Sequence, residues 1–216
     1  MDSFAFLTFR PKKPGNRPAR SLPHICIMTL VVLAGMSVSG KDCRETVTID
    51  GREFTVPERW CGHRLDSSEV ADKTRLVELP EKLTYENYRI YVLAETGTAF
   101  VKMAAAAEKD GLLLIVDSGY RSASYQTEII KRRLADGEEP ETILSFVAPP
   151  GYSEHETGRA VDLVPSDASF AETPAYRWMK ANAAGFGFYE SYPESTADSI
   201  PWEPSHWLYR TLEATR

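Results

Sequence analysis

The sequence predicts an α+β domain in which helices pack on a small, largely antiparallel sheet. Two observations support this class. Segments with helical periodicity and short strand-like segments alternate irregularly along residues 41–216, without the repeated β-α-β units that indicate a parallel sheet. A hydrophobic fraction of 43% in 216 residues is typical of one globular domain with some additional sequence.

The additional sequence lies at the start of the chain. Basic residues precede the apolar stretch ICIMTLVVLAGMSV (residues 25–38), and the small residues of SVSG end at residue 40. This order is typical of a secretory signal peptide, and the apolar stretch is shorter than the about 20 residues that a membrane-spanning helix needs. Residues 1–40 are therefore predicted to be a signal peptide or, alternatively, an uncleaved N-terminal anchor. Both interpretations predict an exported domain, in the periplasm or cell envelope.

The exported part is acidic and contains two cysteines. Of 25 basic and 31 acidic residues, residues 1–40 contain five and one, which leaves 20 and 30 and a net charge of −10. Because phosphate binding depends on clustered Lys and Arg, we exclude nucleic acid as a ligand. Cys26 belongs to the signal, so Cys43 and Cys61 remain as a pair in an oxidising compartment. This favours a disulfide worth about 3 kcal/mol, with two free thiols as the alternative.

The exported chain begins with a charged segment, residues 41–80, that precedes the main domain at 81–216. Within it, ETVTIDGREFTV predicts a hairpin around Asp50-Gly51, and no residue there indicates chemistry. The segment ETGTAFVKMAAAAEK (residues 95–109) then predicts a helix that ends before Gly111. Its buried stripe is predicted to comprise Phe100, Met103, Ala104 and Ala107.

The main domain continues with a strand, a helix and a loop. LLLIVD (residues 112–117) is an apolar run of strand length, a helix follows at about residues 123–134, and residues 137–151 predict an exposed loop. Thr173 as an N-cap and Gly185 as a stop predict another helix. The aromatic tail IPWEPSHWLYR predicts a final strand from about His206.

Asp162 interrupts the apolar, strand-like run AVDLV, where an unpaired charge is costly unless a cation, hydrogen-bond donors or a metal satisfies it. Four histidines are present, of which His24 lies in the signal and His63 in the charged N-terminal segment. His155 and His206 remain. With Asp162 they form the three-ligand set of a catalytic zinc site, which keeps a fourth position open to water. Each histidine alone would more often be structural, so the combination carries this prediction.

Further charged residues stand near these ligands in the sequence. Glu154 and Glu156 flank His155, but neighbours on an extended segment point to opposite sides, so both are poor co-ligands. Glu203, three residues before His206 in WEPSHW, is a candidate general base for a water that the metal acidifies. Arg121 in SGYRS could bind a substrate carboxylate or stabilise an oxyanion, with a surface salt bridge as the alternative.

The motifs SGYRSASYQ, SEHETGRAVDL and WEPSHW, in this order, resemble those of the VanY-type D-alanyl-D-alanine carboxypeptidases. These are zinc peptidases of bacterial cell-wall peptides, with a fold shared with lysostaphin-like enzymes and the Hedgehog signalling domain. The resemblance runs from about Tyr91 to Arg210 and leaves residues 41–80 unexplained. The pattern Ser-x-His-x-x-Gly-x-Ala-x-Asp followed by Glu-x-x-His-Trp is specific.

This resemblance implies roles for the motif residues. Zinc would be bound by His155, Asp162 and His206, with Glu203 as general base and Arg121 orienting or stabilising the scissile carbonyl.

The resemblance also implies a substrate pocket. Gln126 and Ser153 would hold the terminal D-alanine and its carboxylate, and Tyr192 would form an aromatic wall. Glu156 replaces a common Gln and Arg159 a common apolar residue, two departures that could alter the pocket rim.

The sequence thus predicts an exported zinc D,D-carboxypeptidase that removes the terminal D-alanine of peptidoglycan stem peptides. An L,D-carboxypeptidase or a D,D-endopeptidase with the same zinc site is the alternative within this enzyme class. The alternative from another class is a non-catalytic peptidoglycan-binding module, which would lack the base or gain a closing ligand. Glu203 is present and no fourth ligand is evident. A membrane tether is expected only if residues 1–40 are not cleaved.

Overall fold

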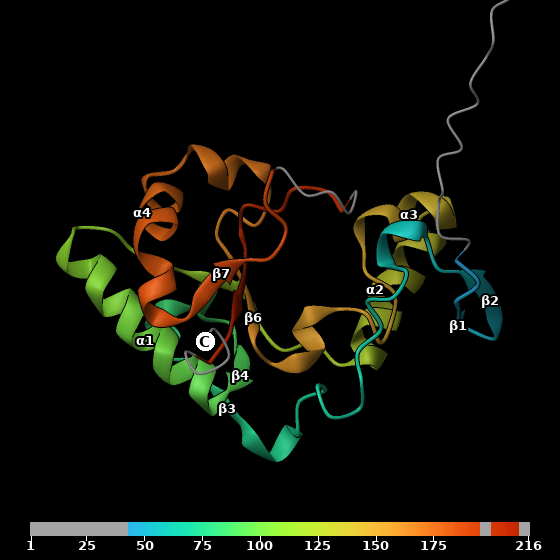
Figure 1. Ribbon diagram of the computed structural model, residues 1–216, viewed down its shortest axis with the longest axis horizontal. Helices are drawn as coiled ribbons and strands as arrows, with labels where there is room; N and C mark the ends of the chain where they lie inside the picture. The colour runs from blue at the N-terminus through green and yellow to red at the C-terminus, as the bar shows by residue number, and fades with distance from the viewer. Residues whose placement is uncertain (1–42, 195–199, 212–216) are drawn as a thin grey trace, which may run out of the picture. The chain divides into compact units, whose positions relative to one another are not determined.

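The centre of the fold is a four-stranded antiparallel sheet with the strand order β5-β6-β8-β7 (Figure 1). Two smaller antiparallel pairs, β1-β2 and β3-β4, lie outside it. This arrangement, with helices packed around a small antiparallel sheet, confirms the predicted fold class. The strands are β1 (Thr46–Ile49), β2 (Arg52–Thr55), β3 (Leu76–Glu78), β4 (Tyr91–Leu93), β5 (Val116–Ser118), β6 (Ala160–Leu163), β7 (Phe188–Glu190) and β8 (His206–Tyr209).

The computed structural model describes residues 43–194 and 200–211. The predicted signal peptide or anchor, with Cys26 and His24, lies outside the described residues. Within the described ranges, none of the helices combines the length and apolar character that a membrane crossing requires. Short 3-10 helices connect the larger elements: η1 (Glu58–Trp60), η2 (Lys73–Arg75), η3 (Glu81–Leu83), η4 (Tyr85–Asn87), η5 (Glu154–Thr157), η6 (Ala168–Glu172) and η7 (Ala183–Phe186).

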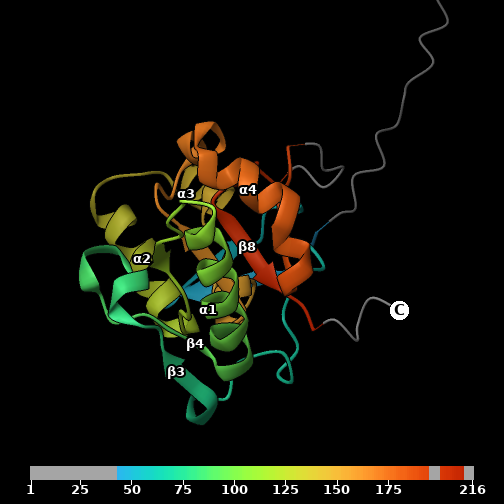
Figure 2. The same cartoon turned by 90° about the vertical axis from the view of Figure 1, so that its left-hand side faces the viewer.

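Two helices, α1 (Ala94–Lys109) and α4 (Pro174–Asn182), build the core beside the sheet. In Figure 2, β8 is seen between α1 and α4. The predicted stripe of α1 is buried, with Phe100 packed edge-on against Phe188 of β7 at 5.9 Å between ring centroids. The Thr173 hydroxyl accepts a hydrogen bond from the Tyr176 amide at 3.0 Å, which confirms the predicted N-cap of α4. The left-handed stop lies at Gly187, after η7, rather than at Gly185.

A second core lies around α2 (Ala123–Ala135), α3 (Pro140–Phe146) and the β1-β2 hairpin. These elements lie together in Figure 1, away from α1 and α4. The predicted helix at 123–134 is confirmed. Helix α3 occupies the segment where a loop was expected, because a proline is well placed in the first helical turn and Ile143 and Leu144 become buried against Trp60. The strand expected at 112–117 is reduced to its end, β5.

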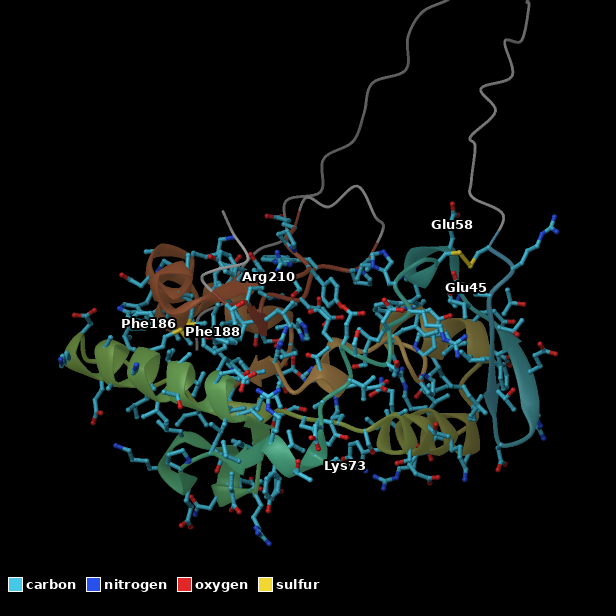
Figure 3. The ribbon with its side chains drawn as sticks, turned by 60° about the horizontal axis from the view of Figure 1, so that its bottom comes forward. Glu45, Glu58, Lys73, Phe186, Phe188 and Arg210 are labelled. Carbon is cyan, nitrogen blue, oxygen red and sulfur yellow. A yellow bond between two sulfur atoms is a disulfide. The ribbon has the colours of Figure 1, made fainter. Side chains whose placement is uncertain are left out.

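The N-terminal segment is held by its turn and by a disulfide. Asp50 and Gly51 both have positive φ, 52° and 74°, as a two-residue hairpin turn requires, which confirms the predicted hairpin. Cys43 and Cys61 are joined in a disulfide with a Cα–Cα distance of 5.8 Å. Figure 3 shows this bond in yellow beside Glu45 and Glu58.

We expect the disulfide to stabilise the folded chain, because it restricts a loop with a sequence separation of 18 in the unfolded state. Replacing Cys43 and Cys61 together by Ser should lower the free energy of unfolding by about 3 kcal/mol in denaturant titrations. A reductant should destabilise the wild type to a similar extent and leave the double variant unchanged. An unfolding curve of the wild type that does not respond to reductant would contradict the prediction.

Candidate metal centre and active site

The buried aspartate of the sequence lies directly across the sheet from one of the histidines. Asp162 of β6 pairs in register with His206 of β8, so both side chains leave the same face of the sheet. The Nδ1 atom of His206 lies 2.9 Å from Oδ1 of Asp162. The pairing of these two strands therefore brings together residues that stand 44 positions apart in the chain.

His155 reaches the same carboxylate from η5, the turn before β6. Gly158 ends this turn with a left-handed φ of 66°, which lets the chain enter β6 directly. The Nε2 atom of His155 lies 3.0 Å from Oδ2 of Asp162, and its Nδ1 atom lies 2.7 Å from the carbonyl oxygen of Gly119. A glycine is required at 119 because a Cβ there would stand only 2.6 Å from the Tyr91 carbonyl oxygen.

The donor atoms of His155, Asp162 and His206 lie within 4.8 Å of one another, as a shared cation requires. A carbonyl oxygen only accepts hydrogen bonds, so the Gly119 carbonyl fixes the hydrogen of His155 on Nδ1 and leaves a lone pair on Nε2. That Nε2 is buried and has no hydrogen-bond partner, although a carboxylate oxygen lies beside it. Two imidazoles and one carboxylate with an unpartnered buried nitrogen fit a metal such as zinc.

The charges of this cluster act on one another through a buried environment. Burial opposes ionisation of Asp162, but the adjacent His155 and His206 outweigh it and hold the pKa of the carboxyl well below its usual range. Burial likewise opposes the charged form of His206, yet its two carboxylate neighbours, Asp162 and Glu154, raise its pKa to about 10. For His155, burial and the nearby Arg121 lower the pKa. Asp162 is thus held as a carboxylate, the form that binds a cation.

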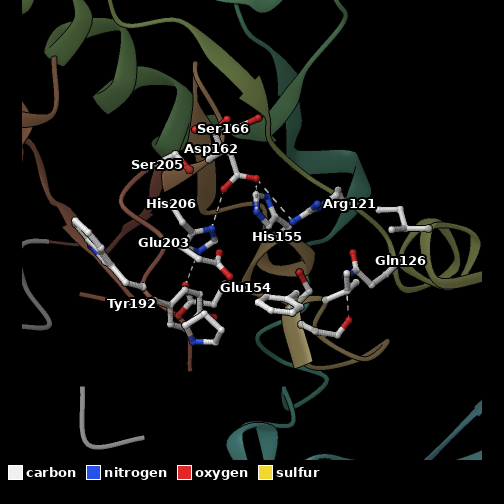
Figure 4. Close-up of a pocket in the computed structure, with 18 of the residues that line it drawn as sticks. Arg121, Gln126, Glu154, His155, Asp162, Ser166, Tyr192, Glu203, Ser205 and His206 are labelled. Carbon is white, nitrogen blue, oxygen red and sulfur yellow. Dashed lines mark hydrogen bonds and ion pairs between the residues drawn. The ribbon is translucent and has the colours of Figure 1, made fainter. Parts of the chain in front are cut away.

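The metal cluster opens into a cavity of about 380 Å³ (Figure 4). The cavity is enclosed by the sheet on one side and by α2, the end of α3 and Trp60 on the other. Every site residue predicted from the sequence lines this cavity: Arg121, Gln126, Ser153, His155, Asp162, Tyr192, Glu203 and His206.

Glu203 lies in the turn that leads into β8. Its amide donates to the Tyr192 carbonyl at 3.1 Å, and its own carbonyl accepts from the His206 amide at 3.0 Å. Burial raises the pKa of the Glu203 carboxyl, an environment that favours taking up a proton. In the described part of the chain, Glu203 does not belong to the group of donor atoms that could share a metal ion. This arrangement is suited to a base beside the metal rather than to a fourth ligand.

Arg121 points into the cavity rather than out to solvent (Figure 4). Its side chain is 25% exposed, and its ion pair with Oδ2 of Asp162 is long at 3.8 Å. Its Nε is buried without a hydrogen-bond partner. The guanidinium therefore keeps donors for a group that enters the cavity, which differs from the alternative of a surface salt bridge.

The remaining predicted residues form the walls. The Gln126 amide donates to the Ala148 carbonyl at 2.9 Å, and its Oε1 atom is buried without a partner. The ring of Tyr192 stacks on His206 with 5.0 Å between centroids and 27° between planes. Ser153 is buried at the start of η5.

Trp60 and Glu154 also line the cavity, and neither was expected there from the sequence. Trp60, from the segment without assigned chemistry, donates from Nε1 to the Leu144 carbonyl at 2.8 Å and packs edge-on against Tyr192 at 6.3 Å. Glu154 was assigned to an extended segment, but η5 turns it so that its Oε2 lies 2.9 Å from Nε2 of His206. The only sequence signal for Trp60 was its position beside the disulfide cysteine at 61.

The two departures from the family pattern do not lie where they were expected. Glu156 is buried and accepts a hydrogen bond from the Gly151 amide at 2.7 Å, and Arg159 is exposed. Neither lines the cavity. The expectation that these residues alter the pocket rim is therefore wrong.

The fold and the site together contain the parts of a metal-dependent hydrolase: a three-donor metal cluster, a half-buried carboxyl and an arginine around one cavity. The chain belongs to the VanY D-alanyl-D-alanine carboxypeptidase family, whose model matches residues 89–212, more than half of the sequence.

Individual proteins show the same relationship. A D-alanyl-D-alanine carboxypeptidase of Enterococcus faecalis is 35% identical over 122 residues, which cover 50% of this chain and 44% of the relative. The chain thus spans less than half the length of this relative. The LdcB LD-carboxypeptidase structure has a TM-score of 0.60 and 26% identity, covering 76% of this chain and 83% of that one. A variant of the vancomycin resistance D,D-pentapeptidase VanY in complex with Zn(II) has a TM-score of 0.53 and 27% identity, covering 70% and 85%.

We expect the cluster to bind close to one metal ion per chain. The variants His155→Ala, Asp162→Ala and His206→Ala should each lose most of the zinc that elemental analysis detects after dialysis, because each removes one of the three donors that the described residues bring together here. His63→Ala, which changes an exposed histidine outside this cluster, is the matched control and should keep it. Full zinc content in Asp162→Ala would show that the cluster is not the metal site.

Proposed function

We propose that this protein is an exported, zinc-dependent D-alanyl-D-alanine carboxypeptidase that removes the terminal D-alanine from peptidoglycan stem peptides. The observation that carries the proposal is the convergence of His155, Asp162 and His206 on a cavity that also contains Glu203 and Arg121. Family membership and the named relatives support the same activity. Residues 81–216 would form the catalytic domain, and export is supported by the signal-like residues 1–40 together with the disulfide.

Zinc would be held by His155, Asp162 and His206, and the buried, unpartnered Nε2 of His155 supports a cation at this point. When bound, zinc supplies a Lewis acid that polarises a carbonyl and makes water more acidic.

Glu203 would carry the proton during hydrolysis. It takes a proton from the water that attacks the carbonyl of the scissile amide, so that a carbon–oxygen bond forms. It then gives this proton to the leaving amine of D-alanine as the carbon–nitrogen bond breaks. Burial raises the pKa of the Glu203 carboxyl, which makes it a better proton acceptor than an exposed glutamate.

Arg121 and the cavity walls would bind the substrate. The planar guanidinium suits two parallel hydrogen bonds to a carboxylate or the scissile carbonyl oxygen, and its Nε is unpartnered. The free Oε1 of Gln126 is an acceptor for an N–H of the peptide, and Ser153 offers a hydroxyl. Tyr192 would close the pocket beside the metal ligands.

A second candidate is an L,D-carboxypeptidase that uses the same site on tetrapeptide stems. It is favoured by the likeness to the LdcB LD-carboxypeptidase structure, whose TM-score of 0.60 exceeds the 0.53 of the VanY structure. The zinc cluster, the base and the arginine would serve both activities. The two activities would therefore differ in which stem peptide the cavity accepts.

Incubation of the exported protein with defined stem peptides tests the proposal. We expect D-alanine release from pentapeptides, measured by mass spectrometry, and abolition of that release by a chelator. Glu203→Gln should keep its zinc while turnover falls by about 10²- to 10⁴-fold or more, because general acid–base assistance is lost. Release from tetrapeptides alone would establish the L,D activity instead. Peptide binding without any release would indicate a binding module, and loss of zinc in Glu203→Gln would make this residue a ligand.

Arg121 should be required in its exact chemical form. Arg121→Lys keeps the charge but loses the planar fork, so kcat/KM should fall substantially while zinc content stays normal. A loss in kcat indicates that the arginine acts mainly on the transition state, whereas a rise in KM indicates that it mainly holds substrate. Arg159→Lys, at an exposed position outside the cavity, is the control and should leave both constants unchanged. Wild-type kinetics in Arg121→Lys would exclude the assigned role.

A further inference from the structure

Glu154 makes a buried contact that the proposed mechanism does not use. Its Oε2 atom lies 2.9 Å from Nε2 of His206, the nitrogen on the other side of the ring from the Asp162 contact. The His206 side chain is 4% exposed and that of Glu154 22%. Placing a carboxylate in such an environment costs free energy unless the contact compensates for it.

We propose that Glu154 is a positioning residue that fixes the tautomer and the ring orientation of His206 for metal binding, an inference that rests on the proposed zinc site. A neutral imidazole carries one hydrogen, and a carboxylate only accepts hydrogen bonds. Both ring nitrogens of His206 lie beside a carboxylate, Asp162 at Nδ1 and Glu154 at Nε2. A metal at Nδ1 would use the lone pair of that nitrogen, and Glu154 would then hold the one remaining hydrogen on Nε2. Nδ1 is the atom that faces Asp162, and therefore the one that faces the shared metal position.

The other proposed histidine ligand, His155, is also held by a hydrogen-bond acceptor at the nitrogen that does not face the metal, but the acceptor is different. His155 is fixed through Nδ1 by the Gly119 carbonyl, which leaves Nε2 for the metal. His206 is fixed in the opposite sense, through Nε2 and by a carboxylate. A charged acceptor makes the stronger hydrogen bond and the more basic imidazole, so Glu154 should strengthen His206 as a ligand.

The ring of His206 is also held in its plane. Tyr192 stacks on it at 5.0 Å, while Glu154 fixes the direction in which Nε2 points. Both residues line the active-site cavity, so the positioning contacts lie beside the metal ligands rather than in a distant core.

Glu154 is not a metal ligand in this arrangement. Among the described residues, the atoms that could share this ion are those of His155, Asp162 and His206, and Glu154 is outside the group. Glu156 provides a comparison within the same turn, because it is the other glutamate of η5 and is buried, but contacts the Gly151 amide instead of a histidine. A Gln at this second position keeps an acceptor for that amide.

The test measures zinc affinity by chelator competition in the full exported protein, for wild type, Glu154→Ala, Glu154→Gln and Glu156→Gln. We expect Glu154→Ala to bind zinc about 10- to 100-fold more weakly, the usual effect of removing an outer hydrogen-bond partner of a metal ligand. Glu154→Gln should lose less, since its amide oxygen still accepts but carries no charge. Glu156→Gln should match the wild type.

Nitrogen NMR of the zinc-loaded protein supplies a readout that general destabilisation would not move. The Nε2 hydrogen of His206 should be protected from exchange in wild type and Glu156→Gln, and should lose this protection in Glu154→Ala. Equal zinc affinity in wild type and Glu154→Ala, or an equal loss in Glu156→Gln, would overturn the inference. A loss in Glu154→Ala as complete as in His155→Ala would overturn it too, by making Glu154 a ligand. If the wild type binds no zinc, the proposed function itself fails.

If Glu154→Ala does not fold, the comparison of Glu154→Gln with Glu156→Gln decides. Both change one η5 carboxyl into an amide of the same shape, and only the first touches His206. Weaker zinc binding in Glu154→Gln alone supports the positioning role, and identical affinities contradict it.

Discussion

The carboxylate of Asp162 in the middle of the sheet is the constraint on which the site depends. A buried negative charge is tolerated only with close positive or hydrogen-bonding partners, and here two histidines provide them, one at each carboxylate oxygen. The register of β6 against β8 fixes one partner, His206, and the η5 turn before β6 fixes the other, His155. This carboxylate and the two histidines that satisfy it are the three donors of the candidate metal cluster.

One residue in the second wall of the cavity, Trp60, comes from a part of the chain outside the region that matches the family. The first core, around α1 and α4, supports the sheet, and the second core, around α2 and α3, supports Trp60. Trp60 is anchored by its hydrogen bond to Leu144 and is adjacent to a cysteine of the disulfide. It contacts Tyr192, which in turn stacks on His206. The N-terminal segment is thus structurally continuous with the active site.

The sequence predicted the elements and residues that carry local or strongly patterned signals. Helix α1 followed from its apolar stripe, and the three motif segments contain every predicted cavity residue except Tyr192. The contact of Trp60 with Leu144 spans 84 positions and that of Glu154 with His206 spans 52, so neither leaves a local pattern. Glu154 was also hidden by the assumption of an extended backbone, since a 3-10 turn rotates neighbouring side chains differently from a strand.

The surroundings of three carboxyl groups around one cavity shift their pKa values in different directions. Burial opposes the ionisation of all three carboxyl groups. Asp162 and Glu154 each contact a histidine, however, and this contact lowers their pKa values. Among the residues that the structure describes, no histidine side chain donates a hydrogen bond to the Glu203 carboxyl, and burial raises the pKa of this carboxyl. Groups held ionised suit cation binding and ligand orientation, whereas a group with a raised pKa suits proton transfer. These environments match the roles proposed for the three chemically similar side chains: Asp162 as a metal ligand, Glu154 as the residue that orients His206, and Glu203 as the group that exchanges protons.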